Sequence, residues 1–161
     1  MGTEIERKFL VRDGYRPETP GVAYMQGYLV SGTGGATVRV RLAGDEAFLT
    51  IKGPTEGISR LEFEYSIPVK DARHMLKRLA KGFIIEKTRH KVDYAGHTWE
   101  IDFFHGENEG LIVAEVELKR PDEPVMLPDW VRAEVSEDRR YANSYLARHP
   151  FSTWENPGGC E

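Results

Sequence analysis

The sequence contains one cysteine among its 161 residues, which excludes an intramolecular disulfide and a zinc site built from several thiolates. It has no apolar run near the roughly 20 residues needed to span a bilayer, and its first residues lack the pattern of a signal peptide. It also has no excess of positive charge, since its net charge is −4. Duplex nucleic acid normally binds to a clearly basic face. We therefore expect no membrane partner, no nucleic-acid partner and a reducing, cytoplasmic location.

The chain contains enough apolar residues for the core of one packed domain and enough charged residues for its surface. Hydrophobic residues make up 40% and charged residues 30%, which argues against disorder. A chain of this length is typical of one domain and is short for two. We predict a single domain over residues 1–150 and a tail, rich in glycine, proline and polar residues, over residues 151–161.

The dominant pattern is an alternation of period two, which is typical of strands with two different faces. It predicts eight strands, over residues 4–11, 22–30, 37–42, 46–52, 58–67, 83–94, 97–104 and 111–119. Helices are predicted over 71–81, with Asp71 as N-cap and Gly82 just after its end, and over 139–148.

The segments between the predicted strands are mostly short. Residues 32–35 are expected to form a hairpin turn, and 121–129, with three prolines, a loop. Short turns favour antiparallel connections, and eight strands suffice to close a barrel around one small ligand. The predicted fold is therefore mainly β, an eight-stranded antiparallel closed barrel with a few covering helices.

On seven of these strands the charged residues share one parity, and apolar residues largely occupy the other. Two interpretations follow: the charged side is the solvated surface of an ordinary barrel, or it lines the lumen. Adjacent like charges such as Arg39 and Arg41, or Glu115 and Glu117, repel each other without structural benefit on a solvated face. In a lumen, grouped carboxylates bind hard divalent cations and grouped bases clamp phosphate oxygens. Spacing alone leaves both interpretations open.

The order of the motifs resembles a known family. Glu4-Ile5-Glu6-Arg7-Lys8 fits the ExExK signature of the CYTH superfamily, the triphosphate tunnel metalloenzymes. The resemblance continues through Val38–Arg41, Thr50–Gly53, Arg60–Glu64, Glu86–Arg89, Glu100–Asp102, Ala114–Glu117 and Tyr141–Ser144. It implies an eight-stranded tunnel with charged side chains pointing inward. It also implies an activity on triphosphates, and the chain is most similar to the bacterial inorganic tripolyphosphatases of the family.

The resemblance also implies roles for individual residues and a divalent cofactor, Mg²⁺ or Mn²⁺. The expected metal ligands are Glu4, Glu6, Asp102, Glu115 and Glu117. The expected substrate-binding bases are Lys8, Arg39, Arg41, Lys52, Arg60, Lys87, Arg89 and Lys119. The expected catalytic residues are Lys8, Tyr28, Glu6 and Glu117. Glu62 and Glu64 either bind metal or pair with the arginines and hold them straight.

These roles predict metal-dependent hydrolysis of the terminal phosphoanhydride of inorganic tripolyphosphate, with nucleoside triphosphates as further substrates. Three alternatives stay open: a class IV-type adenylate cyclase, a thiamine triphosphatase, and a polyphosphate-binding module without catalysis. Outward apolar strand faces also favour a homodimer.

Overall fold

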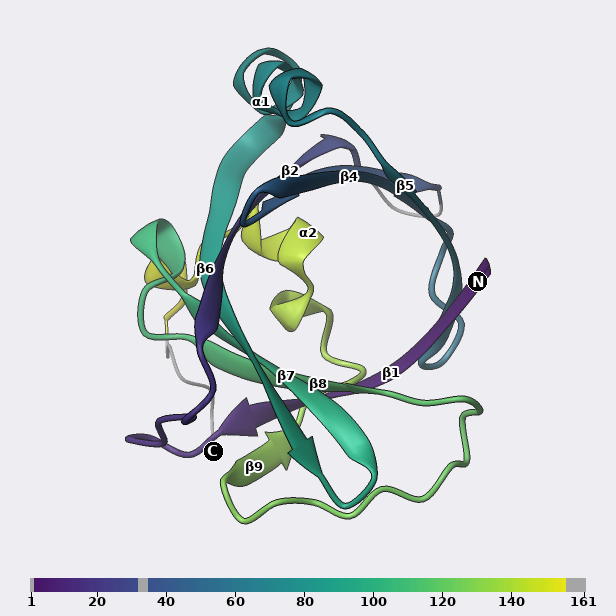
Figure 1. The fold of residues 1–161 in the computed structure, drawn as a ribbon, viewed down its shortest axis with the longest axis vertical. Helices are drawn as coiled ribbons and strands as arrows, with labels where there is room; N and C mark the ends of the chain where they lie inside the picture. The colour runs from purple at the N-terminus through teal and green to yellow at the C-terminus, as the bar shows by residue number, and fades with distance from the viewer. Residues whose placement is uncertain (1, 32–34, 156–161) are drawn as a thin grey trace.

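A computed structural model describes residues 2–31 and 35–155, and the described chain folds around a ring of antiparallel strands (Figure 1). The strands are β1 (Gly2–Val11), β2 (Gly21–Val30), β3 (Thr37–Ala43), β4 (Glu46–Lys52), β5 (Ser59–Ser66), β6 (Lys81–Tyr94), β7 (His97–Phe104), β8 (Ile112–Glu117) and β9 (Val131–Glu134). The helices are α1 (Val69–Arg78) and α2 (Asn143–Leu146), with 3₁₀ turns η1 (Gly106–Asn108), η2 (Arg139–Tyr141) and η3 (Phe151–Thr153).

Eight of the strands close into a barrel. Their order is β5-β4-β3-β2-β6-β7-β8-β1, and a further pairing between β1 and β5 completes the ring. The first half of β1 pairs with β5 and the second half pairs with β8. The predicted eight-stranded antiparallel barrel is therefore confirmed. Strand β9, which pairs with the end of β1 outside this ring, was not predicted, because four residues are too few to show a period of two.

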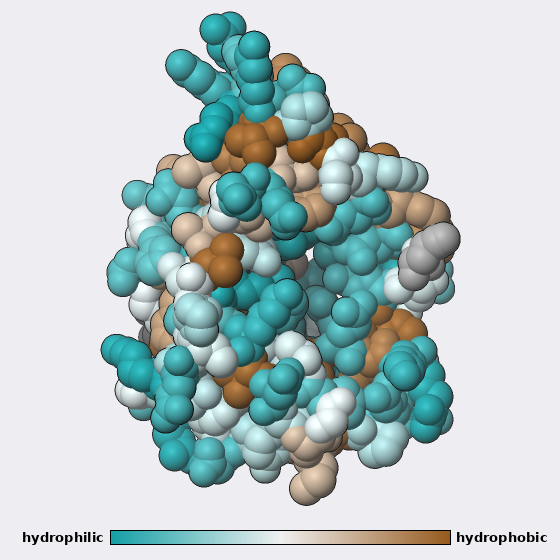
Figure 2. Space-filling view, in the orientation of Figure 1, coloured by the Kyte–Doolittle hydropathy of each residue, from teal (hydrophilic) through white to brown (hydrophobic). Residues whose placement is uncertain are grey.

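The register of the ladders decides which side chains face the lumen. Across β1 and β8, Glu6 is opposite Glu117 and Lys8 is opposite Glu115, so these charges share one face. On the next ladder, Arg89 of β6 is opposite Asp102 of β7. Figure 2 shows a hollow near the centre of the molecule with mostly hydrophilic residues around it. The charged parity lines the lumen, as the second of the two interpretations requires.

The outward parity forms two apolar clusters between the barrel and its covers. Helix α1 packs Ala72 and Leu76 against Val40 of β3. The segment after β8 covers a second cluster, in which Trp130 meets Trp99 edge to face with ring centroids 5.5 Å apart. Each cover removes apolar barrel surface from water, and this burial is the main force that stabilises an inside-out barrel.

One outward face stays uncovered. On β5 the side chains of Leu61, Phe63 and Tyr65 are 57%, 42% and 56% exposed. They alternate with the lumen-facing Glu62 and Glu64, as the pattern predicted. Within the described chain, no helix or loop buries this stripe.

The helices differ in detail from their predicted bounds. Helix α1 begins at Val69 after Pro68, so Asp71 lies in its first turn and is not its N-cap. Gly82 lies in β6 with φ of +76°, and a Cβ there would lie 2.4 Å from the carbonyl oxygen of Ala147. The predicted helix at 139–148 is divided into η2 and α2, because Ala142 has an extended backbone.

The C-terminal segment does not cover the barrel from outside. In Figure 1, α2 lies within the outline of the ring, and Ala142, Asn143 and Ser144 line the lumen cavity. Beyond it, Phe151 is buried in a cluster with Tyr141 and Leu146. The predictions about the turn at Gly32–Gly34 and about the tail from residue 156 onward lie outside the described residues. Among the described helices, none has the length and apolarity to cross a membrane.

Candidate active site in the barrel lumen

A cavity of about 400 Å³ occupies the lumen, and side chains from all eight strands of the ring line it. It brings together twelve of the predicted site residues: Glu4, Glu6, Lys8, Tyr28, Arg39, Arg41, Lys52, Arg60, Lys87, Arg89, Glu115 and Glu117. Glu62, Glu64 and Glu100 line it as well. Residues that are up to 113 positions apart in sequence therefore share one polar chamber of a size suited to a small polyanion.

Two predicted site residues lie outside this lining. Asp102 is 1% exposed, because the side chains of Arg89 and Lys87 contact it and separate it from the cavity. Lys119 is exposed beyond the end of β8, and its backbone N–H donates a hydrogen bond to Glu123. Because β8 ends at Glu117, the alternation of inward and outward side chains does not extend to Lys119.

One side of the chamber concentrates positive charge. Arg39, Lys87 and Arg89 are each at most 6% exposed, and Arg41 faces the same space. Burial, together with Arg39 and Arg89, lowers the pKa of Arg41 to about 10. Burial likewise lowers the pKa of Lys87 to about 7, with Arg89 and Arg41 adding to the effect of burial. Such crowding of cations is unfavourable in an empty chamber and is relieved by a bound polyanion.

Tyr24 supports this basic cluster from β2, the strand between β3 and β6. The guanidinium carbons of Arg41 and Arg89 both lie 4.9 Å from the centroid of the Tyr24 ring. A cation above an aromatic face is attracted by the ring quadrupole without being neutralised. The ring therefore orients the two arginines and leaves their charge available.

Asp102 holds the cluster from behind. Its two carboxylate oxygens accept hydrogen bonds from Nε and Nη2 of Arg89 at 2.7 and 2.9 Å, and Nζ of Lys87 lies 2.8 Å from Oδ2. Burial opposes ionisation of Asp102, but Arg89 and Lys87 outweigh it and hold the pKa of this carboxyl well below its usual range. The contacts of Asp102 in this structure are those of a residue that fixes two bases.

The other side of the chamber concentrates carboxylates. Nζ of Lys52 lies 3.1 Å from Oε1 of Glu4, and Arg60 donates to the same oxygen. Burial raises the pKa of Glu4, but Lys52 and Arg60 outweigh it and bring the value down to about 2. Glu115 pairs with Lys8 at 3.4 Å. These two carboxylates are ionised and already partnered by bases.

Glu6 and Glu117 are different, because they face each other across the ladder and neither makes an ion pair within the described chain. Burial raises the pKa of Glu6 to about 8, and the nearby Glu115 and Glu4 add to the shift. Burial also raises the pKa of Glu117, with Glu4 and Glu100 contributing. Among the residues that the structure describes, neither carboxylate has a base within ion-pair distance.

A divalent cation fits this donor set. The carboxylates of Glu4, Glu6, Glu115 and Glu117 all reach the one chamber and offer oxygen ligands, which Mg²⁺ and Mn²⁺ prefer. In the part of the chain that the structure describes, no three acidic or histidine side chains already converge on one point. Metal binding therefore requires these side chains to close around the ion, most directly at Glu6 and Glu117, which have no ion pair to break within residues 2–31 and 35–155.

Lys8 and Tyr28 line the same chamber but take different partners. Nζ of Lys8 donates to the carbonyl oxygen of Tyr141 at 3.2 Å. The Tyr28 hydroxyl accepts a hydrogen bond from Gln26 at 3.3 Å. No hydrogen bond joins Lys8 to Tyr28 in the described structure.

Three lumen residues were not predicted as site residues: Tyr24, Gln26 and Asn143. Gln26 and Tyr24 share the parity of Tyr28 on β2, and a lone amide in an otherwise apolar strand was the available signal for Gln26. Asn143 was already part of the motif at Tyr141–Ser144, but nothing local indicates that this segment enters the barrel.

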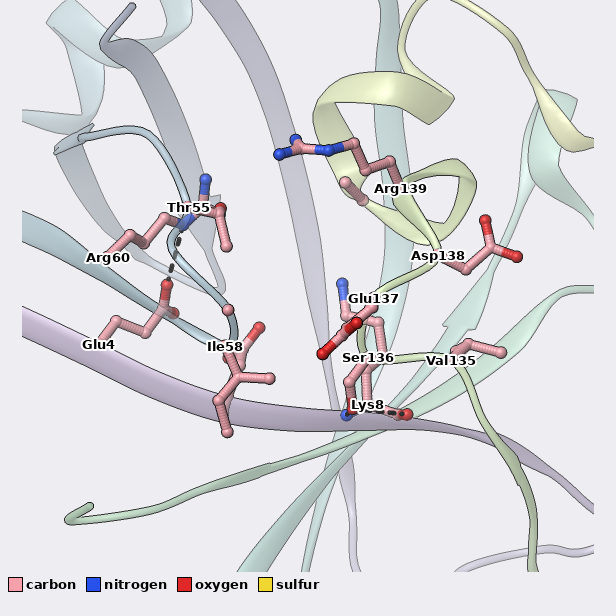
Figure 3. Close-up of a pocket in the computed structure, with 13 residues that line it drawn as sticks. Glu4, Lys8, Thr55, Ile58, Arg60, Val135, Ser136, Glu137, Asp138 and Arg139 are labelled. Carbon is pink, nitrogen blue, oxygen red and sulfur yellow. Dashed lines mark hydrogen bonds and ion pairs between the residues drawn. The ribbon is translucent and has the colours of Figure 1, made fainter. Parts of the chain in front are cut away.

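A second cavity of about 290 Å³ adjoins the chamber and shares Glu4, Glu6, Lys8 and Arg60 with it. Its other wall is the segment from Val135 to Arg139. Figure 3 shows Arg139 and Arg60 projecting from opposite sides of this space. The carboxylate side of the chamber is therefore open to a further polar space.

The sequence pattern of the CYTH domain matches residues 2–148, nearly the whole chain. The chain belongs to the CYTH family. This CYTH chain is similar to an inorganic triphosphatase of Acetivibrio thermocellus, at 48% identity over 96% of the chain and 99% of the relative. It is also similar to an inorganic triphosphatase of Nitrosomonas europaea, at 39% identity over 90% of the chain and 97% of the relative.

A solved structure agrees with these sequence relatives. The crystal structure of an inorganic triphosphatase superposes with a TM-score of 0.66 at 36% identity, over 91% of this chain and 95% of the other. The triphosphate tunnel enzymes of the CYTH family depend on a metal ion. The family assignment thus agrees with a lumen that combines phosphate-binding bases and carboxylates.

Proposed function

We propose that this CYTH protein hydrolyses the terminal phosphoanhydride of inorganic tripolyphosphate, releasing orthophosphate and pyrophosphate, and that it also accepts nucleoside triphosphates. The observation that carries the proposal is the division of one lumen cavity into a basic side around Arg41 and Lys87 and an acidic side around Glu6 and Glu117. The similar proteins named inorganic triphosphatases support the substrate class.

The basic side binds the phosphate chain. Arg39, Arg41 and Arg89 present planar forks that match phosphate oxygens, while Lys52 and Lys87 act as point charges. Lys8 and Arg60 stand near the carboxylates, where the terminal phosphoryl group meets the metal side. Lys119 is exposed outside the chamber, so we give it no part in binding.

The acidic side holds the cofactor, which we propose to be Mg²⁺ or Mn²⁺ bound by Glu6 and Glu117, with Glu4 and Glu115 beside them. When bound, the ion neutralises charge on the triphosphate oxygens and activates the attacking water. Glu4 keeps Lys52 and Arg60 in place through its hydrogen bonds. Asp102 acts as a positioning residue for Arg89 and Lys87 and not as a metal ligand.

Catalysis then rests on positioning and electrostatics. The transition state of phosphoryl transfer spreads negative charge over the oxygens of the transferred group. The buried bases are fixed by Asp102, Tyr24 and Glu115 before substrate arrives, so they need no rearrangement to stabilise that charge. Lys8, which contacts both Glu115 and the C-terminal segment, is placed to bind the terminal phosphoryl oxygens.

The alternatives have less support. A binding module without catalysis needs the bases but has no use for Glu6 and Glu117, two carboxylates that form no ion pair in the described part of the chain. An adenylate cyclase requires a pocket for the adenine base, whereas charged and polar side chains predominate in the lumen cavity. A thiamine triphosphatase would use the same chamber, so only a measured substrate preference distinguishes it from a tripolyphosphatase.

The deciding assay measures phosphate release from tripolyphosphate, ATP, thiamine triphosphate and pyrophosphate, each with Mg²⁺, Mn²⁺ or EDTA. The proposal predicts the highest kcat/KM for tripolyphosphate, activity with a divalent ion and none in EDTA. Cyclic AMP as the main product of ATP, or a preference for thiamine triphosphate, would overturn it.

We further propose that the protein acts in the cytoplasm as a homodimer. The support for a dimer is the exposed apolar stripe at Leu61, Phe63 and Tyr65. Light scattering during gel filtration tests it, with a mass near twice 18.3 kDa expected and a mass of one chain at all concentrations contradicting it.

A further inference from the structure

Two neutral amides sit inside the basic cluster and connect it to the C-terminal segment. The Asn143 Oδ1 atom accepts hydrogen bonds from Nζ of Lys87 at 2.9 Å and from Nε2 of Gln26 at 3.2 Å. The Oε1 atom of Gln26 accepts a hydrogen bond from Nε of Arg41 at 2.9 Å. One chain of hydrogen bonds therefore runs from Arg41 through Gln26 and Asn143 to Lys87.

The residues of this chain are placed by different parts of the fold. Gln26 is fully buried on β2, between the strands that carry Arg41 and Lys87. Asn143 begins α2, whose neighbours Tyr141 and Leu146 are buried in the core cluster at this end of the barrel. The C-terminal segment is thus anchored on both sides of Asn143, so the amide has a fixed place beside Lys87.

The chemistry of the two amides matters because they are neutral. A carboxylate acceptor, such as Asp102 for Arg89, fixes a base and also compensates its charge. An amide oxygen fixes a base by a hydrogen bond and leaves the full charge uncompensated. Of the four clustered bases, Arg41 and Lys87 contact amides, and they lie on the two strands that flank β2. Lys87 also pairs with Asp102, so Asn143 gives this base a second acceptor without a second negative charge. The two amides consequently hold these bases without adding negative charge to the basic side of the cavity.

We propose that Gln26 and Asn143 are positioning residues of the triphosphate site, which hold Arg41 and Lys87 through neutral acceptors and so add no negative charge to the basic cluster. The inference rests on the proposed function and adds the C-terminal segment to the substrate site. It requires that substrate binding depends both on the presence of an acceptor at this place and on the acceptor being uncharged. One substitution can remove the acceptor and another can add a charge to it, so the two requirements can be tested separately.

The key pair of variants is Asn143→Ala, which removes the acceptor, and Asn143→Asp, which keeps an oxygen acceptor at the same place and adds a negative charge. Asn143→Ala leaves Lys87 without its second partner, so we expect a lower Tm and at least a tenfold loss of kcat/KM for tripolyphosphate with Mg²⁺. Asn143→Asp places a negative charge beside Lys87, so we expect a Tm equal to or above that of the wild type.

The negative charge introduced by Asn143→Asp stabilises the substrate-free protein but repels the triphosphate, so it weakens substrate binding. For Asn143→Asp we expect KM for tripolyphosphate to rise about tenfold or more while the Tm is preserved. Gln26→Glu keeps the acceptor for Arg41 and also adds a negative charge. We expect it likewise to raise KM for tripolyphosphate while the Tm is preserved. Opposite movements of stability and affinity are not expected for a residue with a purely structural role.

Asn108→Asp is the matched control. Asn108 is also a buried amide, and its Oδ1 accepts the backbone N–H of Phe151 at 2.8 Å, outside the lumen lining. We expect this substitution to change the Tm and to leave KM for tripolyphosphate at the wild-type value.

The outcomes separate this inference from the proposed function. If wild-type protein releases no phosphate from tripolyphosphate, the proposed function fails, while the Tm order of Asn143→Asp above Asn143→Ala still tests the hydrogen-bond network. If wild type is active, the inference is overturned by a wild-type KM in both Asn143→Asp and Gln26→Glu. It is also overturned by a wild-type kcat/KM in Asn143→Ala.

Discussion

Glu6 and Glu117 are direct cross-strand partners on β1 and β8, with their side chains in the same lumen and no ion pair from either within the described chain. Like charges directly opposite each other destabilise a sheet. The pair therefore lowers the stability of the metal-free protein and provides a place where a divalent cation is stabilising. The same two residues therefore lower the stability of the metal-free protein and supply ligands for the cation.

The first prediction concerns Glu6→Gln. A carboxyl whose pKa is raised in the folded state lowers the free energy of unfolding. This loss grows as the pH rises from the pKa in the unfolded chain, about 4.3, to the pKa in the folded protein. The folded pKa of Glu6 is about 8, so removal of its charge stabilises the metal-free protein most at pH 8 and above. We expect a higher Tm in EDTA, no further rise with Mg²⁺, and almost no turnover.

The control for that variant is Glu18→Gln, at an exposed position before β2. It removes the same charge and is expected to leave the Tm, the Mg²⁺ response and the turnover unchanged. A Glu6→Gln variant that keeps wild-type turnover and its Mg²⁺ response would contradict a metal role for Glu6.

The second prediction concerns protons released on metal binding. With a pKa of about 8, most Glu6 is protonated at pH 7 in the metal-free protein, and a metal ligand must be deprotonated. Calorimetric titration of Mg²⁺ in buffers of different ionisation enthalpy should report release of about one proton at pH 7 and much less at pH 9. Mg²⁺ affinity should rise with pH up to about 8. Equal proton release at both pH values would disprove this coupling.

The third prediction separates geometry from charge among the arginines. Arg39→Lys and Arg41→Lys keep the positive charge but lose the planar fork. A lost hydrogen bond to a charged group costs about 1.5–3 kcal/mol, so kcat/KM for tripolyphosphate should fall by about tenfold to a hundredfold. Arg73→Lys, on the exposed face of α1, is the matched control and should show wild-type kinetics. Full activity in both lumen variants would mean that the forks do not bind phosphate.

The fourth prediction assigns the role of Asp102. Removing its charge in Asp102→Asn leaves Arg89 and Lys87 buried without their shared counter-charge, which typically costs about 3–5 kcal/mol of stability. A positioning residue should lose substrate affinity and stability together while Mg²⁺ binding by calorimetry persists. Loss of Mg²⁺ binding with unchanged stability would instead make Asp102 a metal ligand, as its family motif predicted.

The strand pattern was sufficient to predict the strands and which residues share a face, because a period of two is a local property of the chain. Glu4 and Glu6, or Arg39 and Arg41, share a face whatever else the protein does. The interpretation of that face as a lumen needed the family resemblance as well. Spacing alone does not say on which side of a sheet the solvent lies.

What could not be predicted depends on distant packing. The division of the C-terminal helix at Ala142 brings Asn143 into the lumen, and no local signal marks that path. The end of β8 at Glu117 places Lys119 outside. The enclosure of Asp102 by Arg89 and Lys87 follows from the β6–β7 register, which is set by the Ala95–Gly96 turn and the whole ring.

The most direct test of the account is a ³¹P NMR time course of tripolyphosphate with the wild-type protein. It resolves tripolyphosphate, pyrophosphate and orthophosphate in one sample, with Mg²⁺ and then with EDTA. We expect loss of tripolyphosphate with Mg²⁺, the appearance of pyrophosphate and orthophosphate in equal amounts, and no change in EDTA. Tripolyphosphate that persists with both Mg²⁺ and Mn²⁺, or is consumed equally fast in EDTA, would contradict it.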